Sequence, residues 1–146
     1  MVYREEKRDL LTVPQGYMLA HCISADFALG AGIAKQIDSA FNMRQMLHIM
    51  WGKNSGMEDN WSVPCCLPCV NVFNLVTKEK CFHKPTLESL ESALEEMKNF
   101  SISMGVKKIA MPMIGCGLDR LEWDDVSEMI RRIFEDTDIE ILVCVL

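Results

Sequence analysis

The sequence predicts a three-layer α/β fold with a mixed, mostly parallel central sheet. Three observations predict it: short apolar runs alternate with segments of helical periodicity, two Gly-x-Gly turns follow apolar runs, and 146 residues suit one domain. Alternation favours parallel pairing, because each helix returns the chain to the edge where the next strand begins. We therefore expect residues 1–146 to form a single α/β domain.

In the first half of the chain, residues 2–3 begin a predicted edge strand, and residues 17–23 alternate apolar side chains as a strand does. Residues 31–48 follow a helical period that is interrupted near Phe41, which predicts one or two helices. The stretch 52–68 contains glycines and prolines without a clear period. We expect it to be the least structured segment.

The second half alternates more regularly. Residues 69–76, 107–113 and 139–145 are short and rich in β-branched side chains, which predicts strands. Residues 87–101 and 126–134 carry apolar side chains every three or four positions, which predicts amphipathic helices. The first of these follows a Pro-Thr pair that favours a helix start and precedes a glycine that favours a helix end.

Two segments combine a strand, a Gly-x-Gly turn and a helical pattern: residues 19–24 lead to Gly30–Ala34, and residues 109–114 lead to Gly115–Arg120. Such turns leave backbone N–H groups unpaired, and the dipole of a following helix adds positive potential. Either turn alone is explained equally by a tight turn with positive φ. Two of them suggest a two-sided hold on phosphates, although Lys35 departs from the dinucleotide-binding fingerprint.

Composition and charge limit the classes of function. A formal net charge of −6 disfavours binding to a nucleic-acid backbone, which needs a clustered basic surface. It is compatible with a small anion held by backbone amides. The sequence has no apolar run of membrane-spanning length, and its first residues lack the apolar stretch of a secretory signal. We expect an intracellular protein, nuclear or cytoplasmic, that is monomeric and has no nucleic-acid or membrane partner.

The seven cysteines are an odd number, which favours reduced thiols over a disulfide framework. Cys66 and Cys69 form a C-x-x-C pair beside Cys65. A zinc site needs about four ligands, and the three histidines lie in unrelated contexts. The favoured interpretation is a loop that enters a buried strand, with a zinc or redox motif as the alternative. We expect no metal and no cofactor.

Two residues lie where chemistry on a bound ligand would occur. Lys78 ends an apolar run, where a partly desolvated amine can act as a nucleophile, and Asp119 follows the second Gly-x-Gly turn, where a carboxylate can move protons. Alternatively, Lys78 is a solvated charge and Asp119 caps a helix or pairs with Arg120. We expect His21 to be buried and hydrogen-bonded, and His83 to shape the approach to the next helix.

Several ordered stretches resemble the macrodomain family, specifically its branch of terminal ADP-ribose protein glycohydrolases. The resemblance extends from about Asp9 to Leu146. Its motifs are Leu19–Ser24, Gly30–Ala34, Thr77–Lys78 followed by His83–Thr86, and Met111–Leu121.

This resemblance implies ADP-ribose and mono-ADP-ribosylated proteins as partners, and hydrolysis of mono-ADP-ribose from acidic side chains without a metal. It extends to deacylation of O-acyl-ADP-ribose. The implied ligand-binding residues are Asp9 and Leu10 at the adenine, Ser24, then Gly30, Ala31, Gly32, Ile33 and Ala34 at the distal ribose, Ile114, Gly115, Cys116, Gly117 and Leu118 at the diphosphate, and Leu146 over the nucleotide.

In the same resemblance, Lys78 is the nucleophile that attacks C1″ of the distal ribose, and Asp119 resolves the lysyl adduct. Arg8 and Met113 depart from the family pattern, at a usual glycine and a frequent arginine. Two other functions stay open: a module that reads ADP-ribose without hydrolysing it, and a glycohydrolase that acts on ADP-ribosylated DNA.

Overall fold

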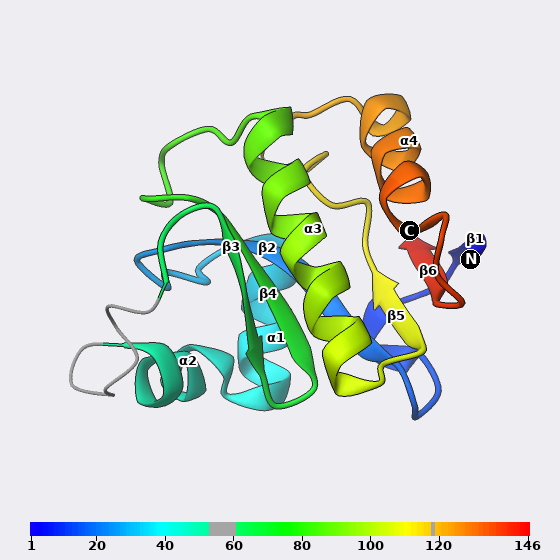
Figure 1. Cartoon of the computed structure of the whole chain (residues 1–146). Coiled ribbons are helices and arrows are strands. Elements are labelled where there is room, and N and C mark those ends of the chain that lie inside the picture. Colours follow the sequence, from blue (N-terminus) through cyan, green and yellow to red (C-terminus); the bar gives the residue numbers. More distant parts are fainter. Residues whose placement is uncertain (53–60, 118) are drawn as a thin grey trace.

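The computed structural model describes residues 1–52, 61–117 and 119–146. Its centre is a six-stranded sheet in the order β1-β6-β5-β2-β4-β3 (Figure 1). All neighbouring strands pair in parallel except β3 and β4. The mixed, mostly parallel α/β sheet is therefore confirmed. The strands are β1 (Val2–Lys7), β2 (Met18–Ser24), β3 (Cys65–Cys69), β4 (Val72–Lys78), β5 (Lys108–Met111) and β6 (Glu140–Val145).

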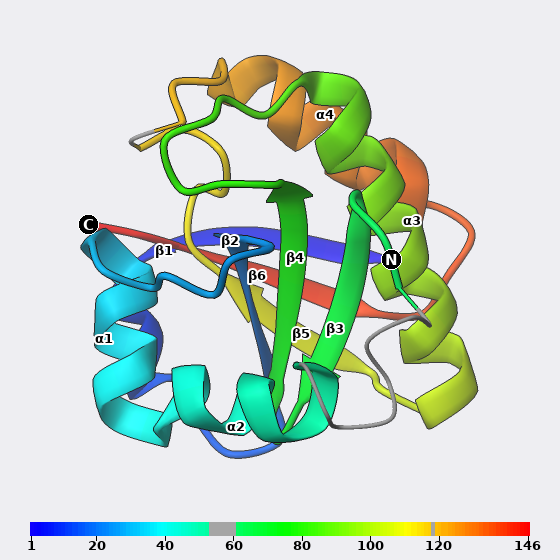
Figure 2. The same ribbon diagram turned by 90° about the vertical axis from the view of Figure 1, so that its left-hand side faces the viewer.

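Helices cover both faces of this sheet (Figures 1 and 2). One face packs against α1 (Gly32–Phe41) and α2 (Met43–Trp51), and the other against α3 (Leu87–Met104) and α4 (Trp123–Phe134). A short 3-10 helix, Leu10–Thr12, follows β1. Within the described residues, no helix combines the length and hydropathy of a membrane-spanning segment.

Each strand of the centre contributes to two apolar cores because successive side chains point to opposite faces. In β6, Ile141 and Val143 pack in the core beneath α3 and α4, whereas Leu142 and Cys144 pack in the core beneath α1 and α2. All four residues are at most 4% exposed. The sheet is therefore buried on both sides and holds its strand ends in fixed positions.

Local signals explain the helix boundaries. Thr86 caps α3 through a reciprocal pair of hydrogen bonds with Ser89, and Gly105 ends the helix in the left-handed conformation. Asn42, at φ 53°, separates α1 from α2, so the region 31–48 contains two helices. The predicted helices and the break between the first two are confirmed.

The expectation for the stretch 52–68 is wrong in its last part. Cys65–Cys69 form β3, which pairs antiparallel with β4, and the backbone N–H of Cys66 donates to Glu96 at 3.0 Å. Residues 53–60 lie outside the described residues. The C-x-x-C pair thus belongs to a strand, and Cys65, Cys66 and Cys69 are free and buried. The described residues contain no group of three metal-ligating side chains.

Candidate active site

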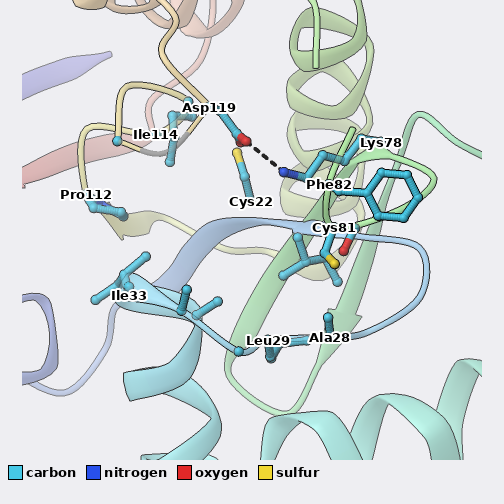
Figure 3. Close-up of a pocket in the computed structure, with 18 of the residues that line it drawn as sticks. Cys22, Ala28, Leu29, Ile33, Lys78, Cys81, Phe82, Pro112, Ile114 and Asp119 are labelled. Carbon is cyan, nitrogen blue, oxygen red and sulfur yellow. Dashed lines mark hydrogen bonds and ion pairs between the residues drawn. The ribbon is translucent and has the colours of Figure 1, made fainter. Parts of the chain in front are cut away.

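Both Gly-x-Gly turns lie at the carboxyl ends of the parallel strands, where they border a cavity of about 660 Å³ (Figure 3). The ends of β2 and β4 form its floor, and its walls come from the segments 28–34, 81–82 and 112–115 and from Gly117. This position is where open α/β sheets bind ligands. The volume is large enough for a nucleotide-sized molecule.

The structure brings together most of the predicted ligand-binding residues. Leu118 lies outside the described residues, and four others, treated below, do not line the cavity. The lining residues among them are Ser24, Gly30, Ala31, Gly32, Ile33, Ala34, Ile114, Gly115 and Gly117.

Four predicted ligand-binding residues do not line this cavity. Asp9 caps the 3-10 helix by accepting a hydrogen bond from the backbone of Leu11 at 2.9 Å, and Leu10 is packed in the core. Cys116 is half-buried, and its thiol donates to the carbonyl of Ile114 at 3.4 Å. The side chain of Leu146 is 92% exposed. Their roles at the ligand stay predictions.

The start of α1 provides backbone donors at one wall of the cavity. Ala31 is the N-cap residue and makes no side-chain hydrogen bond to the first turn of the helix. The N–H groups of that turn therefore lack a side-chain cap, and the helix dipole places positive potential beside them. Gly32, at φ 59°, makes the turn that precedes the helix body. An anionic group in the cavity fits this end of α1.

The opposite wall is the turn after β5. Gly115 has φ 75°, and a Cβ atom there would lie 3.0 Å from Cδ1 of Leu121. The turn is closed by a hydrogen bond from the N–H of Leu121 to the carbonyl of Gly115 at 2.7 Å. A side chain at this position would strain the backbone and crowd Leu121. Glycine is therefore required for this wall to keep its shape.

Lys78 and Asp119 meet at the end of the cavity. Nζ of Lys78 donates to Oδ1 of Asp119 at 2.7 Å, and both side chains are only 14% exposed (Figure 3). The alternative in which Lys78 is a solvated charge is therefore wrong, and the ion-pair partner of Asp119 is Lys78. Lys78 is the last residue of β4, and Asp119 follows the Gly115 turn, so sheet and turn together hold the pair.

A cysteine adjoins this ion pair. Cys22 of β2 points toward Asp119 and Lys78 (Figure 3). Burial, together with the carboxylate of Asp119, raises the pKa of the Cys22 thiol to about 12. Burial also raises the pKa of Cys116 to about 11. Both thiols are protonated near neutral pH and are poor nucleophiles.

Sequence reasoning missed several cavity residues. Phe82 is the clearest, because its ring is 76% exposed and stands at the cavity mouth beside Lys78 (Figure 3). The sequence feature that could have identified Phe82 is an aromatic residue in a polar segment that follows a strand. The other missed lining residues are Cys22, Ile23, Ala28, Leu29, Cys81, Pro112 and Met113.

The two histidines have structural surroundings. Nε2 of His21 lies 2.6 Å from Oδ1 of Asn74 in the interior, and burial lowers the pKa of His21 to about 4. The expected buried, hydrogen-bonded histidine is confirmed. Nδ1 of His83 accepts from the backbone N–H of Lys80 at 3.3 Å, and the ring packs on Phe82. This contact shapes the segment between β4 and α3.

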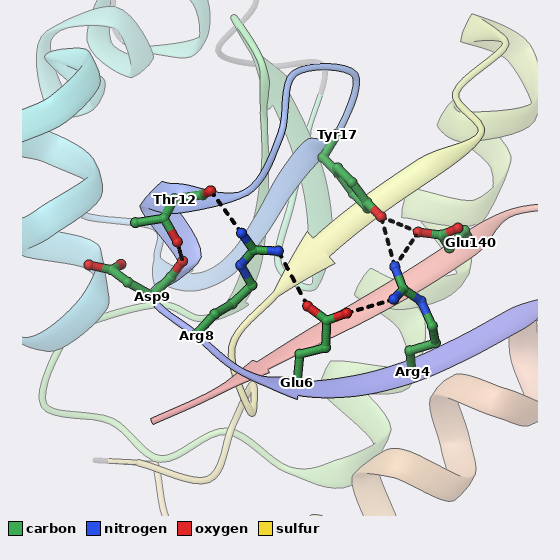
Figure 4. A network of polar contacts seen from close by, with 7 residues as sticks. All are labelled: Arg4, Glu6, Arg8, Asp9, Thr12, Tyr17 and Glu140. Carbon is green, nitrogen blue, oxygen red and sulfur yellow. Dashed lines mark hydrogen bonds and ion pairs between the residues drawn. The ribbon is translucent and has the colours of Figure 1, made fainter.

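Arg8, the departure from the family pattern, stabilises the turn that holds Asp9 (Figure 4). Its guanidinium donates to the carbonyl of Thr12 at 3.1 Å and to Glu6 at 3.3 Å. On the other side of Glu6, Arg4 joins Glu6 to a cluster with Tyr17 and Glu140. Side-chain contacts therefore fix a turn where glycine would leave the backbone freer.

A cavity at the carboxyl edge of a parallel sheet, with an uncapped helix start, a glycine turn and a largely buried Lys–Asp pair, is the kind of site in which α/β proteins bind phosphorylated, nucleotide-like ligands. The family model "Macro domain" matches residues 65–130. ADP-ribose glycohydrolase OARD1 of Homo sapiens is 42% identical over 137 residues, which are 94% of this chain and 87% of that protein. The Bos taurus protein of the same name is 41% identical over the same shares.

Solved structures agree with this fold. The macrodomain of Thermus aquaticus DarG has a TM-score of 0.82 at 23% identity and covers 98% of this chain and 97% of its own. The macrodomain of Mycobacterium tuberculosis DarG has the same TM-score at 17% identity and the same coverage. The chain belongs to the macrodomain family, and the resemblance seen in its motifs is confirmed.

Proposed function

We propose that this protein is an ADP-ribosyl glycohydrolase that removes mono-ADP-ribose from acidic side chains of proteins. The observation that carries the proposal is the buried ion pair of Lys78 and Asp119 at the end of the cavity. The 42% identity to an ADP-ribose glycohydrolase, over most of both chains, supports it. A module that only reads ADP-ribose has no need of a buried amine and carboxylate beside the ligand.

The proposed reaction has two steps. Lys78 passes a proton from Nζ to the carboxylate of Asp119, and the neutral amine attacks C1″ of the distal ribose. A bond forms between Nζ and C1″, the bond from C1″ to the ester oxygen breaks, and the protein carboxylate leaves with that electron pair. The leaving carboxylate takes the proton that Asp119 holds. Asp119, again ionised, then removes a proton from water, which attacks C1″. The bond from C1″ to Nζ breaks, free ADP-ribose leaves, and Asp119 returns a proton to Nζ.

The cavity walls supply position in this proposal. The diphosphate lies between the start of α1 and the Gly115 turn, and the distal ribose lies over Lys78. The same chemistry accepts O-acyl-ADP-ribose, in which a small carboxylate replaces the protein. We also propose that the protein is intracellular and monomeric. Its substrates in this proposal are modified proteins, because a net charge of −6 disfavours binding to nucleic acid.

The first test replaces Lys78 with alanine. We expect Lys78→Ala to bind ADP-ribose within about threefold of the wild-type affinity, since backbone groups hold the phosphates. Release of ADP-ribose from a glutamate-modified protein should fall by at least about a hundredfold. Calorimetry measures the binding and release of labelled ADP-ribose measures the reaction.

Lys80→Ala is the matched control, because Lys80 is an exposed lysine of the same segment and should keep both properties. Release that survives in Lys78→Ala would remove Lys78 from the reaction. A wild-type protein that binds ADP-ribose but releases none from modified proteins would be a reader.

A second test traps the intermediate. Without Asp119, Nζ of Lys78 must give its proton to solvent, so the adduct forms more slowly, and water is no longer activated to resolve it. We therefore expect Asp119→Ala to accumulate ADP-ribose bound to Lys78. Mass spectrometry of the digested protein after incubation with substrate locates the adduct. An adduct on any other residue would reassign the nucleophile, and the doubly substituted Lys78→Ala, Asp119→Ala protein should carry none.

A further inference from the structure

Asp26, in the loop that joins β2 to α1, links two walls of the cavity of about 660 Å³, here called the nucleotide cavity. Its Oδ1 accepts hydrogen bonds from Oγ of Ser24 at 2.5 Å and from the backbone N–H of Ala28 at 3.3 Å. Its Oδ2 accepts from the backbone N–H of Cys81 at 3.1 Å, in the segment between β4 and α3. Ser24, Ala28 and Cys81 line the cavity, whereas Asp26 does not. One carboxylate behind the cavity therefore holds two of its walls together.

The segment that Asp26 holds begins at Lys78. The backbone N–H of Ala25 donates to the carbonyl of Lys78 at 2.9 Å, where the pairing of β2 with β4 becomes irregular. The stretch from Lys78 to Cys81 is therefore bonded to residues 25 and 26 at both of its ends. Phe82 follows directly and stands at the cavity mouth (Figure 3). A displacement of this stretch moves both the proposed nucleophile and the mouth of the cavity.

The loop around Asp26 has a strained backbone. Phe27 and Leu29 have φ values of 52° and 42°, in the left-handed region that residues with side chains rarely adopt. Phe27 is 2% exposed, its ring stacks on that of Trp61, and its carbonyl accepts from Nε of Arg44 at 3.1 Å. Such conformations persist only where the surrounding contacts hold them, and they are concentrated at functional sites. The loop is therefore a fixed support for the carboxylate.

The carboxylate of Asp26 is ionised at neutral pH. Burial alone would raise the pKa of Asp26, but the hydrogen bonds from the hydroxyl of Ser24 and from two backbone N–H groups bring it below its ordinary value. Hydrogen bonds to an ionised acceptor are the stronger kind. An asparagine at this position has one accepting oxygen where the carboxylate has two, so it replaces only part of the link.

We propose that Asp26 is a positioning residue of the reaction. It holds the segment after β4 against the loop after β2, so that the amine of Lys78 meets the distal ribose in a reactive orientation. The inference rests on the proposed function, and Asp26 acts through Lys78 because it does not line the cavity. A shift of about 1 Å at a reacting group can cost about a hundredfold in rate.

The kinetic test uses a peptide that carries ADP-ribose on a glutamate. We expect Asp26→Ala to lower kcat at least about tenfold and to leave KM within about threefold, because the start of α1 and the Gly115 turn still hold the phosphates. Asp26→Asn keeps an acceptor for the N–H of Cys81, so its kcat should fall only about threefold. If Asp26→Ala does not fold, Asp26→Asn carries this measurement and the next.

Glu96→Ala is the matched control. The carboxylate of Glu96 also accepts from a backbone N–H of another element, that of Cys66 at 3.0 Å, and it joins α3 to β3. Both residues lie outside the lining of the nucleotide cavity. Glu96→Ala therefore removes a comparable link and should keep the kcat and KM of the wild type.

Cys81 provides a second measurement that does not depend on catalysis. Its thiol is exposed and lines the cavity, whereas the other six cysteines are buried or half-buried. In the wild type, saturating ADP-ribose should slow alkylation of Cys81 by iodoacetamide at least about tenfold. In Asp26→Ala, at saturation, this protection should fall to about twofold, because the released segment no longer lies against the ligand. Mass spectrometry of the digested protein measures the labelling at Cys81.

Three results would overturn the proposal. They are a KM that rises in Asp26→Ala while kcat is unchanged, a kcat that falls equally in Glu96→Ala, or full protection of Cys81 in Asp26→Ala. Failure of the proposed function looks different, because the wild type would then release no ADP-ribose from the peptide. The labelling of Cys81 alone then decides whether Asp26 holds the segment against the bound nucleotide.

Discussion

Lys78 and Asp119 stabilise each other in a place where neither charge is well hydrated. With both side chains 14% exposed and 2.7 Å between Nζ and Oδ1, each ion compensates for the water that the other lacks. The pair also keeps the amine within proton-transfer distance of a carboxylate. The same contact thus fixes the position of the nucleophile and provides the acceptor for its proton.

His21 shows a second use of burial. Its ring is fully buried, Nε2 lies against Oδ1 of Asn74, and the Asn74 amide donates to the carbonyl of Leu67 at 3.1 Å. Because Oδ1 can only accept, Nε2 carries the proton of a neutral imidazole. Nδ1 has no partner, so a second proton would enter an apolar surrounding.

We predict that His21 makes stability fall in acid. The unfolded state takes up a proton below a pKa of 6.5, whereas the folded state stays neutral down to about 4. This contribution to stability is therefore complete above pH 6.5 and is lost as the pH falls, by roughly 2 to 3 kcal/mol at pH 4.5. Urea unfolding at a series of pH values measures this loss.

His21→Gln keeps a donor for Asn74 and cannot titrate. Its unfolding free energy should decline less than that of the wild type between pH 6.5 and pH 4.5, because the contribution of His21 is then absent. Parallel curves for the two proteins over that interval would contradict a neutral, buried His21.

The sequence predicted the positions of the site residues better than their surroundings. Lys78, Lys80 and Lys84 lie close together in the chain, and nothing in the residue types tells which one is buried. Burial of Lys78 depends on the ends of β2 and β4 and on the turn that holds Asp119. Phe82 was missed for the same reason, since its place at the cavity mouth comes from folding of the segment after β4.

Among the strands, β3 was the one that sequence patterns failed to predict. Its residues, Cys65–Cys69, include two further apolar positions but no alternation with polar ones, because the strand is covered on both faces. Pro68 also disfavours a central strand, and β3 is accordingly at the sheet edge. A strand of cysteines with a proline resembles a loop until its partner β4 is known.

Elements with local signals were predicted well. The Pro-Thr start and the glycine end of α3 are properties of a few adjacent residues, so the sequence contains them directly. The break at Asn42 has a similar cause, because asparagine tolerates the left-handed conformation that separates α1 from α2. Helix boundaries set by capping residues can therefore be predicted from the sequence, whereas a strand defined by its neighbours in the sheet cannot.

At the scale of the whole molecule, one sheet joins the two apolar cores. Side chains of β6 enter both, and β2, β4 and β5 do the same. Loss of one core would expose a face of strands that also support the other. This arrangement predicts that residues 1–146 unfold as one cooperative unit, in accordance with the single domain expected from the length.

We predict coincident unfolding on both faces of the sheet. Trp51 and Trp61 pack with the core of α1 and α2, and Trp123 packs with the core of α3 and α4. In Trp123→Phe the remaining tryptophans report by fluorescence only on the core of α1 and α2. In the doubly substituted Trp51→Phe, Trp61→Phe protein, Trp123 reports only on the core of α3 and α4. Both signals, and far-ultraviolet circular dichroism, should show the same urea midpoint in any one protein.

Ligand binding extends this prediction, because the nucleotide cavity lies between segments that belong to both cores. Ile114 packs with the core of α3 and α4, whereas Leu29 and Ile33 pack with the core of α1 and α2. ADP-ribose at about a hundred times its dissociation constant should add about 2.7 kcal/mol to the unfolding free energy. If the sheet couples the cores, the unfolding free energies measured from the two fluorescence signals both rise by that amount. A rise in only one of them would mean that the two faces unfold separately.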